Sequence, residues 1–250
     1  MKKEIITRPS DADRWINCKG SLNFPTSEAS KFSEEGSFLH EKIKFLIQNI
    51  LEGKDIENEN FLTNEKEDTA LPIALGQFFD IIPIDILKRN LDKVKLEEKI
   101  DHLFFPGTPD VLIPLNPEKG IIIDFKFGRD FVPIGNQLKI YAHLGYSKYG
   151  IKDWELYIIQ PYINRRSPLH LSYDTTEDDF SLIARERHNS DSQFYNAGGW
   201  CKYCSGKGIC HAFQKNTLKE IPEDIALLSD NDLIKIKRKE AKIKSILEGV

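Results

Sequence analysis

The sequence predicts an α/β fold, in which a small mixed β-sheet is flanked by helices. Short runs of β-branched and aromatic residues alternate along the chain with longer segments in which apolar residues recur every three or four positions. Two of the apolar runs, 107–115 and 121–127, are joined by the sequence Asn-Pro-Glu-Lys-Gly, which is typical of a turn. We therefore expect a β-hairpin at the centre of the sheet.

Composition limits the classes of function. Hydrophobic residues make up 40% and charged residues 30% of the 250 residues, as in a soluble globular protein with a full core. No apolar run is long enough to cross a bilayer and no signal-type run follows Met1, so we expect a cytoplasmic protein with no membrane partner. The net charge of −4 excludes a pervasive basic surface, so any contact with nucleic acid must come from a local groove.

Six helical segments are expected, at about 10–20, 33–51, 73–91, 136–149, 176–195 and 230–250. Segment 33–51 has an apolar stripe that includes Leu39 and Ile43, with His40 on the adjoining face. A lone helical histidine is more often a structural residue than a metal ligand. Pro83 is expected to bend or break segment 73–91. The lysines of 230–250 could bind DNA or a partner, although a solvated helix face is the simpler interpretation.

Two further strands are expected at 94–100 and 154–162, because both are rich in β-branched or aromatic residues. Glu97 faces away from the apolar side of the first strand, either toward a functional site or as a solvated charge at the sheet edge. Gln137 and Tyr141 are four residues apart and therefore share one face of helix 136–149. They form either part of a site or a polar helix edge.

The hairpin brings acidic residues together. If its loop closes symmetrically, Leu112 lies opposite Asp124 and Asp110 lies opposite Lys126, and both carboxylates share one side of the sheet with Lys126. Two such carboxylates repel each other unless a cation lies between them, and a divalent metal is the usual solution. The alternative is a surface ion pair of little consequence. The apolar residues around Asp124 argue against that alternative.

Four cysteines form a second candidate site. Cys201, Cys204 and Cys210 are spaced Cys-x2-Cys-x5-Cys, and Cys18 is the only other cysteine in the chain. Without a secretory signal they indicate metal ligation rather than disulfides. Four thiolates hold either zinc or a [4Fe-4S] cluster. His211 competes as the fourth ligand for zinc, although its position next to Cys210 makes joint coordination awkward.

Three motifs resemble the PD-(D/E)XK nuclease superfamily, specifically its RecB-like branch and within it a phage-associated family. They are Gly-Thr-Pro-Asp ending at Asp110, Ile-Asp-Phe-Lys ending at Lys126, and Gln137-x3-Tyr141. The resemblance implies a restriction-endonuclease-like core at about 94–162. It also implies roles for these residues and favours [4Fe-4S] over zinc at the cysteines. The implied ligands of Mg²⁺ or Mn²⁺ are His40, Asp110, Asp124 and the backbone carbonyl of Phe125, with Glu97 as an additional acidic residue; Lys126, Gln137 and Tyr141 complete the implied catalytic set.

By this resemblance the chain is a metal-dependent DNA nuclease. The expected activity is that of an exonuclease on single-stranded DNA or DNA ends, in phage or mobile-element DNA metabolism, with a phage recombination or replication protein as partner. The alternative is a catalytically inactive DNA-binding or scaffold protein with a nuclease fold. We expect a nuclease domain at 1–215, which includes the cysteines, and a basic helical extension at 216–250. That extension ends while still helical in character, which suggests a trimmed chain.

Overall fold

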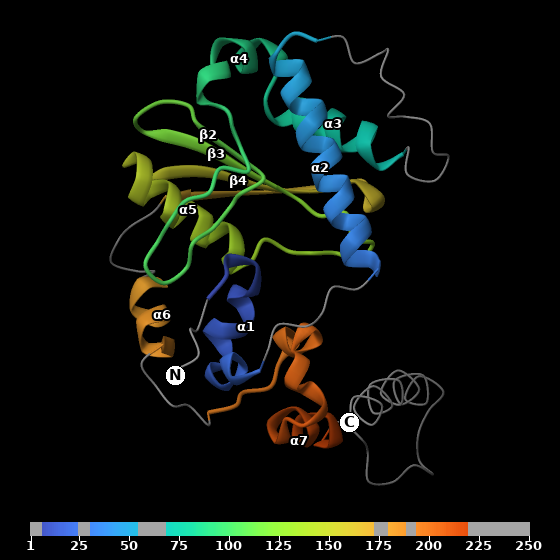
Figure 1. The fold of residues 1–250 in the computed structure, drawn as a ribbon, viewed down its shortest axis with the longest axis vertical. Coiled ribbons are helices and arrows are strands. Elements are labelled where there is room, and N and C mark those ends of the chain that lie inside the picture. The colour runs from blue at the N-terminus through green and yellow to red at the C-terminus, as the bar shows by residue number, and fades with distance from the viewer. Residues whose placement is uncertain (1–6, 25–30, 55–68, 173–179, 189–193, 220–250) are drawn as a thin grey trace. The chain divides into compact units, whose positions relative to one another are not determined.

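The α/β class is confirmed by the structure, a computed structural model that describes residues 7–24, 31–54, 69–172, 180–188 and 194–219 (Figure 1). Its described residues divide into two compact units. One unit contains the sheet and is built from residues 8–10 and 29–180. The other contains all four cysteines and is built from residues at both ends of the chain, 1–7, 11–28 and 181–250. The expected helix at 230–250 lies outside the described residues.

The sheet has five strands in the order β1-β2-β3-β4-β5. The pairing of β3 with β4 is parallel, and the other three pairings are antiparallel. Helix α5, Asn136–Tyr149, is the crossover that a parallel pair requires. The strands are β1 (Lys95–Leu96), β2 (Val111–Pro114), β3 (Lys119–Phe125), β4 (Asp153–Gln160) and β5 (Arg165–Ser172).

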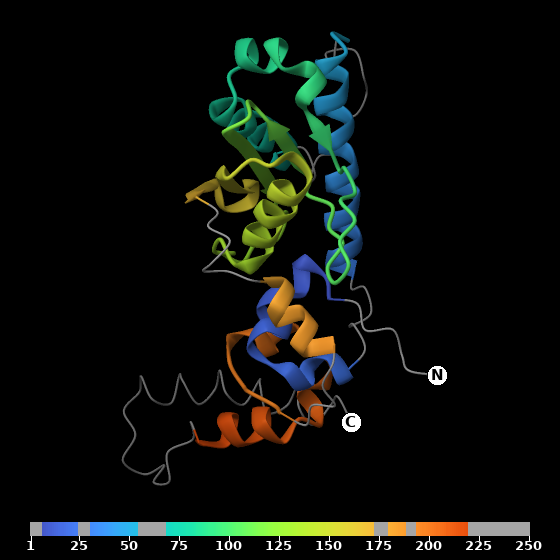
Figure 2. The ribbon, with the colours of Figure 1, turned by 90° about the vertical axis from the view of Figure 1, so that its left-hand side faces the viewer.

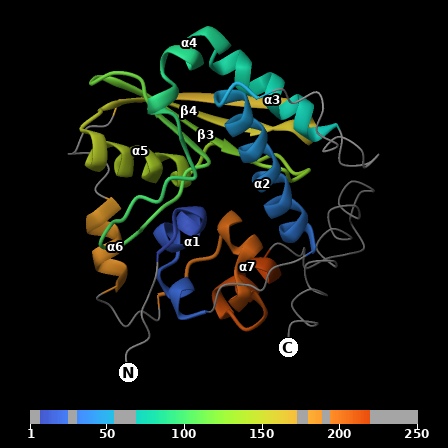
Figure 3. The same cartoon turned by 45° about the horizontal axis from the view of Figure 1, so that its top comes forward.

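Helices cover both faces of this sheet. The apolar stripe of α2, Lys31–Leu51, and that of α3, Ala70–Ile81, pack against the odd-numbered side chains of β3. Figure 2 shows α2 from the side, and Figure 3 shows α3 and α5 on opposite sides of the strands. The helix predicted at 73–91 is broken at Pro83, as expected, because a second helix, α4, begins at Ile84 and ends at Arg89.

The face toward α5 is closely packed around Trp154, which is fully buried. A methyl group added to Gly120 of β3 would lie 2.3 Å from its ring, and one added to Gly145 of α5 would lie 2.5 Å from it. Neither position has room for a larger side chain. These two glycines therefore let the strand, the indole and the helix approach one another closely.

The predicted register of the hairpin is wrong by two residues. Leu112 pairs with Ile122 rather than with Asp124, and Pro114 pairs with Gly120. The loop is tighter than a symmetric closure because the Asn116 side chain accepts hydrogen bonds from the backbone N–H groups of Glu118 and Lys119. A shift of two residues leaves every side chain on its predicted face.

Two other strand predictions need correction. The strand expected at 94–100 forms a continuous ladder only at Lys95–Leu96, because Glu97 adopts a φ of +47° and interrupts it, and one isolated bridge follows between Ile100 and Gly107. No further strand was predicted after the one at 154–162. Instead Asn164, with a φ of +46°, turns it back into the edge strand β5.

The cysteine-containing unit is made of short helices. Helix α1, Ala12–Asn17, is followed by the 3-10 turn Lys19–Asn23, and two further 3-10 turns are Gly199–Tyr203 and Ser205–Gly208. Helices α6 (Phe180–His188) and α7 (His211–Lys219) are the remaining described elements. Arg187 donates hydrogen bonds to the carbonyls of Trp15 and Ile16, at 3.0 and 2.8 Å, and so binds the C-terminal segment to the end of α1.

No helix among the described residues has the length and apolar character needed to span a membrane.

Candidate functional site

Two carboxylates meet where β2 begins and β3 ends. Asp110 directly precedes β2, and Val111 pairs with Ile123, so Asp110 lies beside Asp124. The backbone N–H of Phe125 donates a 2.7 Å hydrogen bond to Asp110 Oδ2, which holds this carboxylate against β3. Asp124 is only 2% exposed. The corrected register thus places the two acidic side chains closer than the symmetric hairpin predicted.

Lys126 follows β3 directly, and its Nζ lies 2.7 Å from Asp124 Oδ2. Although the two atoms are close, Oδ2 is buried and accepts no hydrogen bond of good geometry. The contact is therefore described as an ion pair. Burial raises the pKa of Asp124 above its ordinary value, and the charge of Lys126 only partly offsets this effect. Burial acts to lower the pKa of Lys126, but the charge of Asp124 outweighs it and the net shift is upward.

His40 reaches the same carboxylates from α2. Its Nδ1 lies 3.2 Å from Asp110 Oδ1, and its ring meets Phe127 edge-on at 5.2 Å between centroids. Burial alone would lower the pKa of His40. The hydrogen bond to Asp110 and the charges of both carboxylates outweigh burial and raise the pKa above its ordinary value.

Glu97 adjoins this group through its backbone and its side chain. Its N–H donates to the carbonyl of Asp110 at 3.0 Å, and its carboxylate lies 2.5 Å from the ammonium of Lys44. Glu97, Lys44, His40 and Asp110 line one small pocket. By contrast, Glu98 is hydrogen-bonded to Tyr149 and lies 2.9 Å from Lys148.

Helix α5 contributes Gln137 and Tyr141. Gln137 Nε2 donates to Asp124 Oδ1 at 3.0 Å and to the Tyr141 hydroxyl at 3.2 Å. Burial and the charge of Asp124 raise the pKa of Tyr141, so the phenol keeps its proton at neutral pH. The helix face that Gln137 and Tyr141 share, as predicted, is thus directed at Asp124.

Lys44 is the site residue that the sequence interpretation missed. It lies four residues after His40 and therefore on the same face of α2, which is a signal that the sequence contains. Its partner could not be read in this way, because Glu97 is 53 residues further along the chain.

The charges of the site are balanced in pairs. Asp110 is paired with His40, Asp124 with Lys126, and Glu97 with Lys44. In the described part of the chain no three His, Cys, Asp or Glu side chains, at this site or among the cysteines, are already arranged to hold a metal ion. A metal would have to displace one or more of these cationic side chains.

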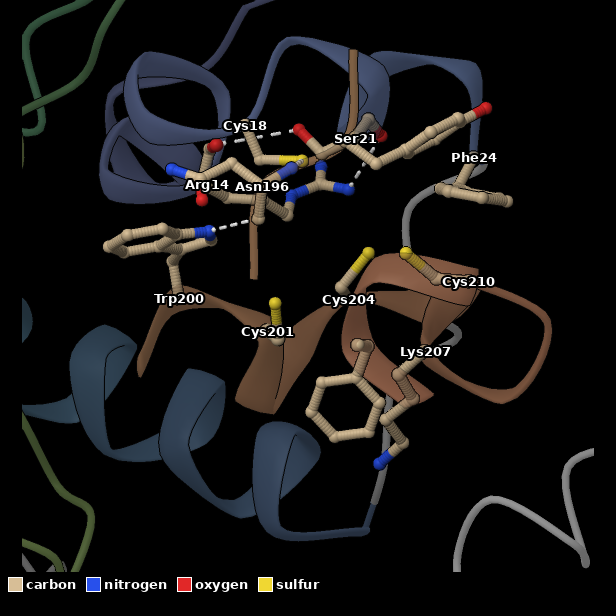
Figure 4. Close-up of a pocket in the computed structure, with 12 residues that line it drawn as sticks. Arg14, Cys18, Ser21, Phe24, Asn196, Trp200, Cys201, Cys204, Lys207 and Cys210 are labelled. Carbon is tan, nitrogen blue, oxygen red and sulfur yellow. Dashed lines mark hydrogen bonds between the residues drawn. The ribbon is translucent and has the colours of Figure 1, made fainter. Parts of the chain in front are cut away.

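The four cysteines face one pocket (Figure 4). Each has a free thiol, and Cys18, Cys201 and Cys204 are buried. The backbone N–H groups of Asn196 and Gly198 donate to the sulfur atoms of Cys18 and Cys201, both at 3.4 Å. Both sulfur atoms are thus held in place by backbone donors.

Arg14 also lines the pocket, and its guanidinium donates to the carbonyl of Ser21 at 3.2 Å, whereas the ammonium of Lys207 points away from the thiols (Figure 4). Burial raises the pKa of Cys201, and the neighbouring cysteines raise it further. Among the described residues that line this pocket, the only sulfur or imidazole groups are the four thiols, so His211 is not one of them.

Together these features define an α/β protein with a buried carboxylate and lysine pair at the end of a mixed sheet and four facing thiols in a separate unit. The chain belongs to the family described as "Protein of unknown function (DUF2800)", whose model matches residues 6–250.

Two solved structures are distantly similar to the chain. One is described as the crystal structure of SSO0001, with 18% sequence identity, coverage of 85% of this chain and 89% of that chain, and a TM-score of 0.40. The other is a phage related exonuclease from Haemophilus somnus 129PT, with 14% identity, coverage of 74% of this chain and 91% of that chain, and a TM-score of 0.31. No curated protein matches the chain. Likenesses this distant assign no activity.

Proposed function

We propose that this protein is a metal-dependent DNA nuclease that acts as an exonuclease on single-stranded DNA or DNA ends, in phage or mobile-element DNA metabolism. The observation that carries the proposal is the convergence of Asp110, Asp124, Lys126 and Gln137 from two strands and a helix onto one buried point. A structural ion pair has no need of a second carboxylate beside it, whereas phosphodiester hydrolysis needs oxygen ligands, a cation and a positioned water.

The donor set fits Mg²⁺ or Mn²⁺. Asp124 Oδ2 is a buried oxygen without a well-formed hydrogen bond, and Asp110, His40 and the carbonyl of Phe125 would be the further ligands once their present partners move. When bound, the metal lowers the pKa of a water molecule and offsets charge on the phosphate. Glu97 becomes an additional ligand if its carboxylate leaves Lys44.

The remaining side chains act on water and substrate. Lys126, held beside Asp124, orients the attacking water and stabilises the negative charge that develops on the phosphate. Gln137 and Tyr141 are both donors, and from α5 they hold the water or a phosphate oxygen next to Asp124.

A digestion assay tests the nuclease. End-labelled linear and circular DNA, each single and double stranded, is incubated with Mg²⁺ or Mn²⁺, and the wild type is compared with Asp124→Ala. Asp101→Ala is the matched control, because Asp101 is an exposed carboxylate of the same unit that pairs only with Lys99. Loss of activity in Asp124→Ala and in chelator, with Asp101→Ala active, supports the proposal. Sparing of circles identifies an exonuclease.

One observation favours the alternative, a catalytically inactive DNA-binding or scaffold protein. Each carboxylate of the site already has its own cationic partner, so its charge is offset without a metal. In this alternative, wild-type protein saturated with Mn²⁺ binds DNA and cuts none of the four substrates. It would then hold a phage recombination or replication protein rather than process DNA.

The four facing thiols support a second proposal, that Cys18, Cys201, Cys204 and Cys210 hold a [4Fe-4S] cluster that joins the two ends of a nuclease domain spanning 1–215. Structural zinc satisfies the same thiols. Anaerobically purified protein that is brown and contains iron supports the cluster. Colourless protein containing zinc refutes it.

A further inference from the structure

Two arginines stacked on aromatic rings lie beside the end of β3, outside the carboxylate site. The guanidinium of Arg129 lies 4.9 Å from the ring centroid of Tyr162, and that of Arg165 lies 4.1 Å from the ring centroid of Phe131. Both arginines are exposed at the surface, and Phe131 is 50% exposed. Each pair joins two segments. Arg129 and Phe131 belong to the loop that leaves β3, and Tyr162 and Arg165 lie at the turn between β4 and β5.

Among the described residues, no carboxylate forms an ion pair with Arg129 or Arg165. The neighbouring Arg166 differs, because its guanidinium lies 3.4 Å from the carboxylate of Asp80. A guanidinium that lies over an aromatic ring is held by the ring without using its N–H donors for a carboxylate, so the donors can bind a phosphate.

The loop that carries Arg129 and Phe131 is held by hydrogen bonds to one buried side chain. Gln160, at the end of β4, is fully buried. Its Oε1 accepts from the N–H of Val132 at 3.0 Å, and its Nε2 donates to the carbonyl of Asp130 at 3.0 Å. The turn on the other side is held by Gln77 of α3, which donates to Asn164 at 3.1 Å. Exposed aromatic and cationic groups on an immobile backbone lose little entropy when they bind a ligand.

The position of these pairs relates them to the candidate active site. Arg129 follows Lys126 by three residues, a chain length of at most about 10 Å. The N–H of Lys126 donates to the carbonyl of Ile159 at 2.8 Å, which joins the two strands from whose ends both pairs extend. Both pairs therefore lie close to the end of the sheet at which Asp124 and Lys126 lie.

We propose that Arg129, Phe131, Tyr162 and Arg165 form a binding track for single-stranded DNA next to the nuclease site. The arginines contact phosphates, and the exposed face of Phe131 stacks on an unpaired base. Unpaired bases are required because a base within a duplex offers no free face to the ring. This inference rests on the proposed function and specifies its substrate as a single strand.

The test measures the Kd of the full-length protein for a fluorescein-labelled oligothymidylate by anisotropy, in EDTA so that no cleavage occurs. Arg129→Ala and Arg165→Ala are each expected to raise the Kd about fivefold to tenfold and to reduce the salt dependence of log Kd by about 0.7. Arg166→Ala is the matched control, because it removes the same charge from the next position of β5, where Asp80 already uses it. It should leave the Kd within about twofold.

Phe131→Ala tests the stacking component. It is expected to weaken binding of the oligothymidylate about fivefold or more while leaving the affinity for a labelled duplex unchanged. Equal losses for both DNAs would overturn the single-strand assignment, and unchanged Kd values in Arg129→Ala and Arg165→Ala would overturn the track. These outcomes are separable from the nuclease proposal: a wild type that binds and cuts nothing defeats the nuclease and not the track.

Discussion

The buried pair of Asp124 and Lys126 predicts a large coupling energy. Replacing Asp124 by Asn leaves an ammonium at a site where the lysine side chain is 25% exposed, and replacing Lys126 by Met leaves a carboxylate on a side chain that is 3% exposed. In either single variant one charge stays buried without its partner. The double variant buries neither charge, and Asp110 still has His40 beside it.

The expected magnitude follows from burial. Removing one partner of a fully buried ion pair costs about 3–5 kcal/mol, and the partial exposure of Lys126 reduces this to about 2–3 kcal/mol for each single variant. For a unit of this size that loss corresponds to a fall in Tm of about 5–10 °C. The double variant should lose about 1 kcal/mol or less, because an uncharged pair of similar volume replaces the ion pair. The coupling energy is therefore about 3–5 kcal/mol.

Urea unfolding followed by circular dichroism, in EDTA at neutral pH, measures the four free energies of the cycle. Asp101 and Lys99 supply the control cycle, because they form an ion pair in the same unit at 2.7 Å with side chains that are 81% and 69% exposed. Their coupling should not exceed about 0.5 kcal/mol. If the two cycles give equal coupling energies, the ion pair at the end of β3 is not buried and the account of the site is wrong.

Three other predictions concern packing, the binding loop and the thiols. Gly145→Ala should lower the free energy of unfolding by about 1–3 kcal/mol in urea titrations, because the new methyl group overlaps Trp154. This loss outweighs the higher helix propensity of alanine. Gly36→Ala is the control: its new methyl group would have no atom within 4 Å, so it should stabilise α2. Gln160→Ala should cost about 1–3 kcal/mol and speed amide hydrogen exchange in the 130–132 loop, because two hydrogen bonds are lost; unchanged exchange would contradict its positioning role. Cys18→Ala should yield protein with less bound metal and a lower Tm, and retention of both would remove Cys18 from the site.

Helix predictions succeeded where the sequence carries local stop signals. Helix α5 was predicted at 136–149 and occupies Asn136–Tyr149, because Gly135 and Gly150 flank it and Gly150 adopts the left-handed conformation with a φ of +72°. The break at Pro83 was likewise predictable, since proline cannot continue a helix.

Strand predictions failed where backbone conformation decided the outcome. Glu97 and Asn164 both have a positive φ, and neither residue type predicts a positive φ as strongly as glycine does. Asn164 turns the chain into β5, an exposed edge strand with a proline inside it, whose composition is typical of a loop. The hairpin register depended on a side-chain hydrogen bond of Asn116 that composition alone does not specify.

Most of the candidate site was nevertheless predictable, because period-two alternation is insensitive to an even register shift. Asp110, Asp124 and Lys126 converge although the predicted pairing was wrong by two residues. The pairing of Lys44 with Glu97 was not predictable, because it joins distant segments and depends on the strained turn at Glu97.

The pairwise charge balance explains how such a site can exist in a folded chain before any metal binds. Asp110 and Asp124 lie side by side in a buried position, and two uncompensated carboxylates there would oppose folding. His40 and Lys126 remove that penalty, one for each carboxylate. A divalent ion would then compete with side chains that remain tethered nearby, so its net affinity is lower than four oxygen and nitrogen ligands alone would give. If the proposed ion binds, the tethered lysine would be left beside it, where the proposed hydrolysis of a phosphodiester would use a positive charge.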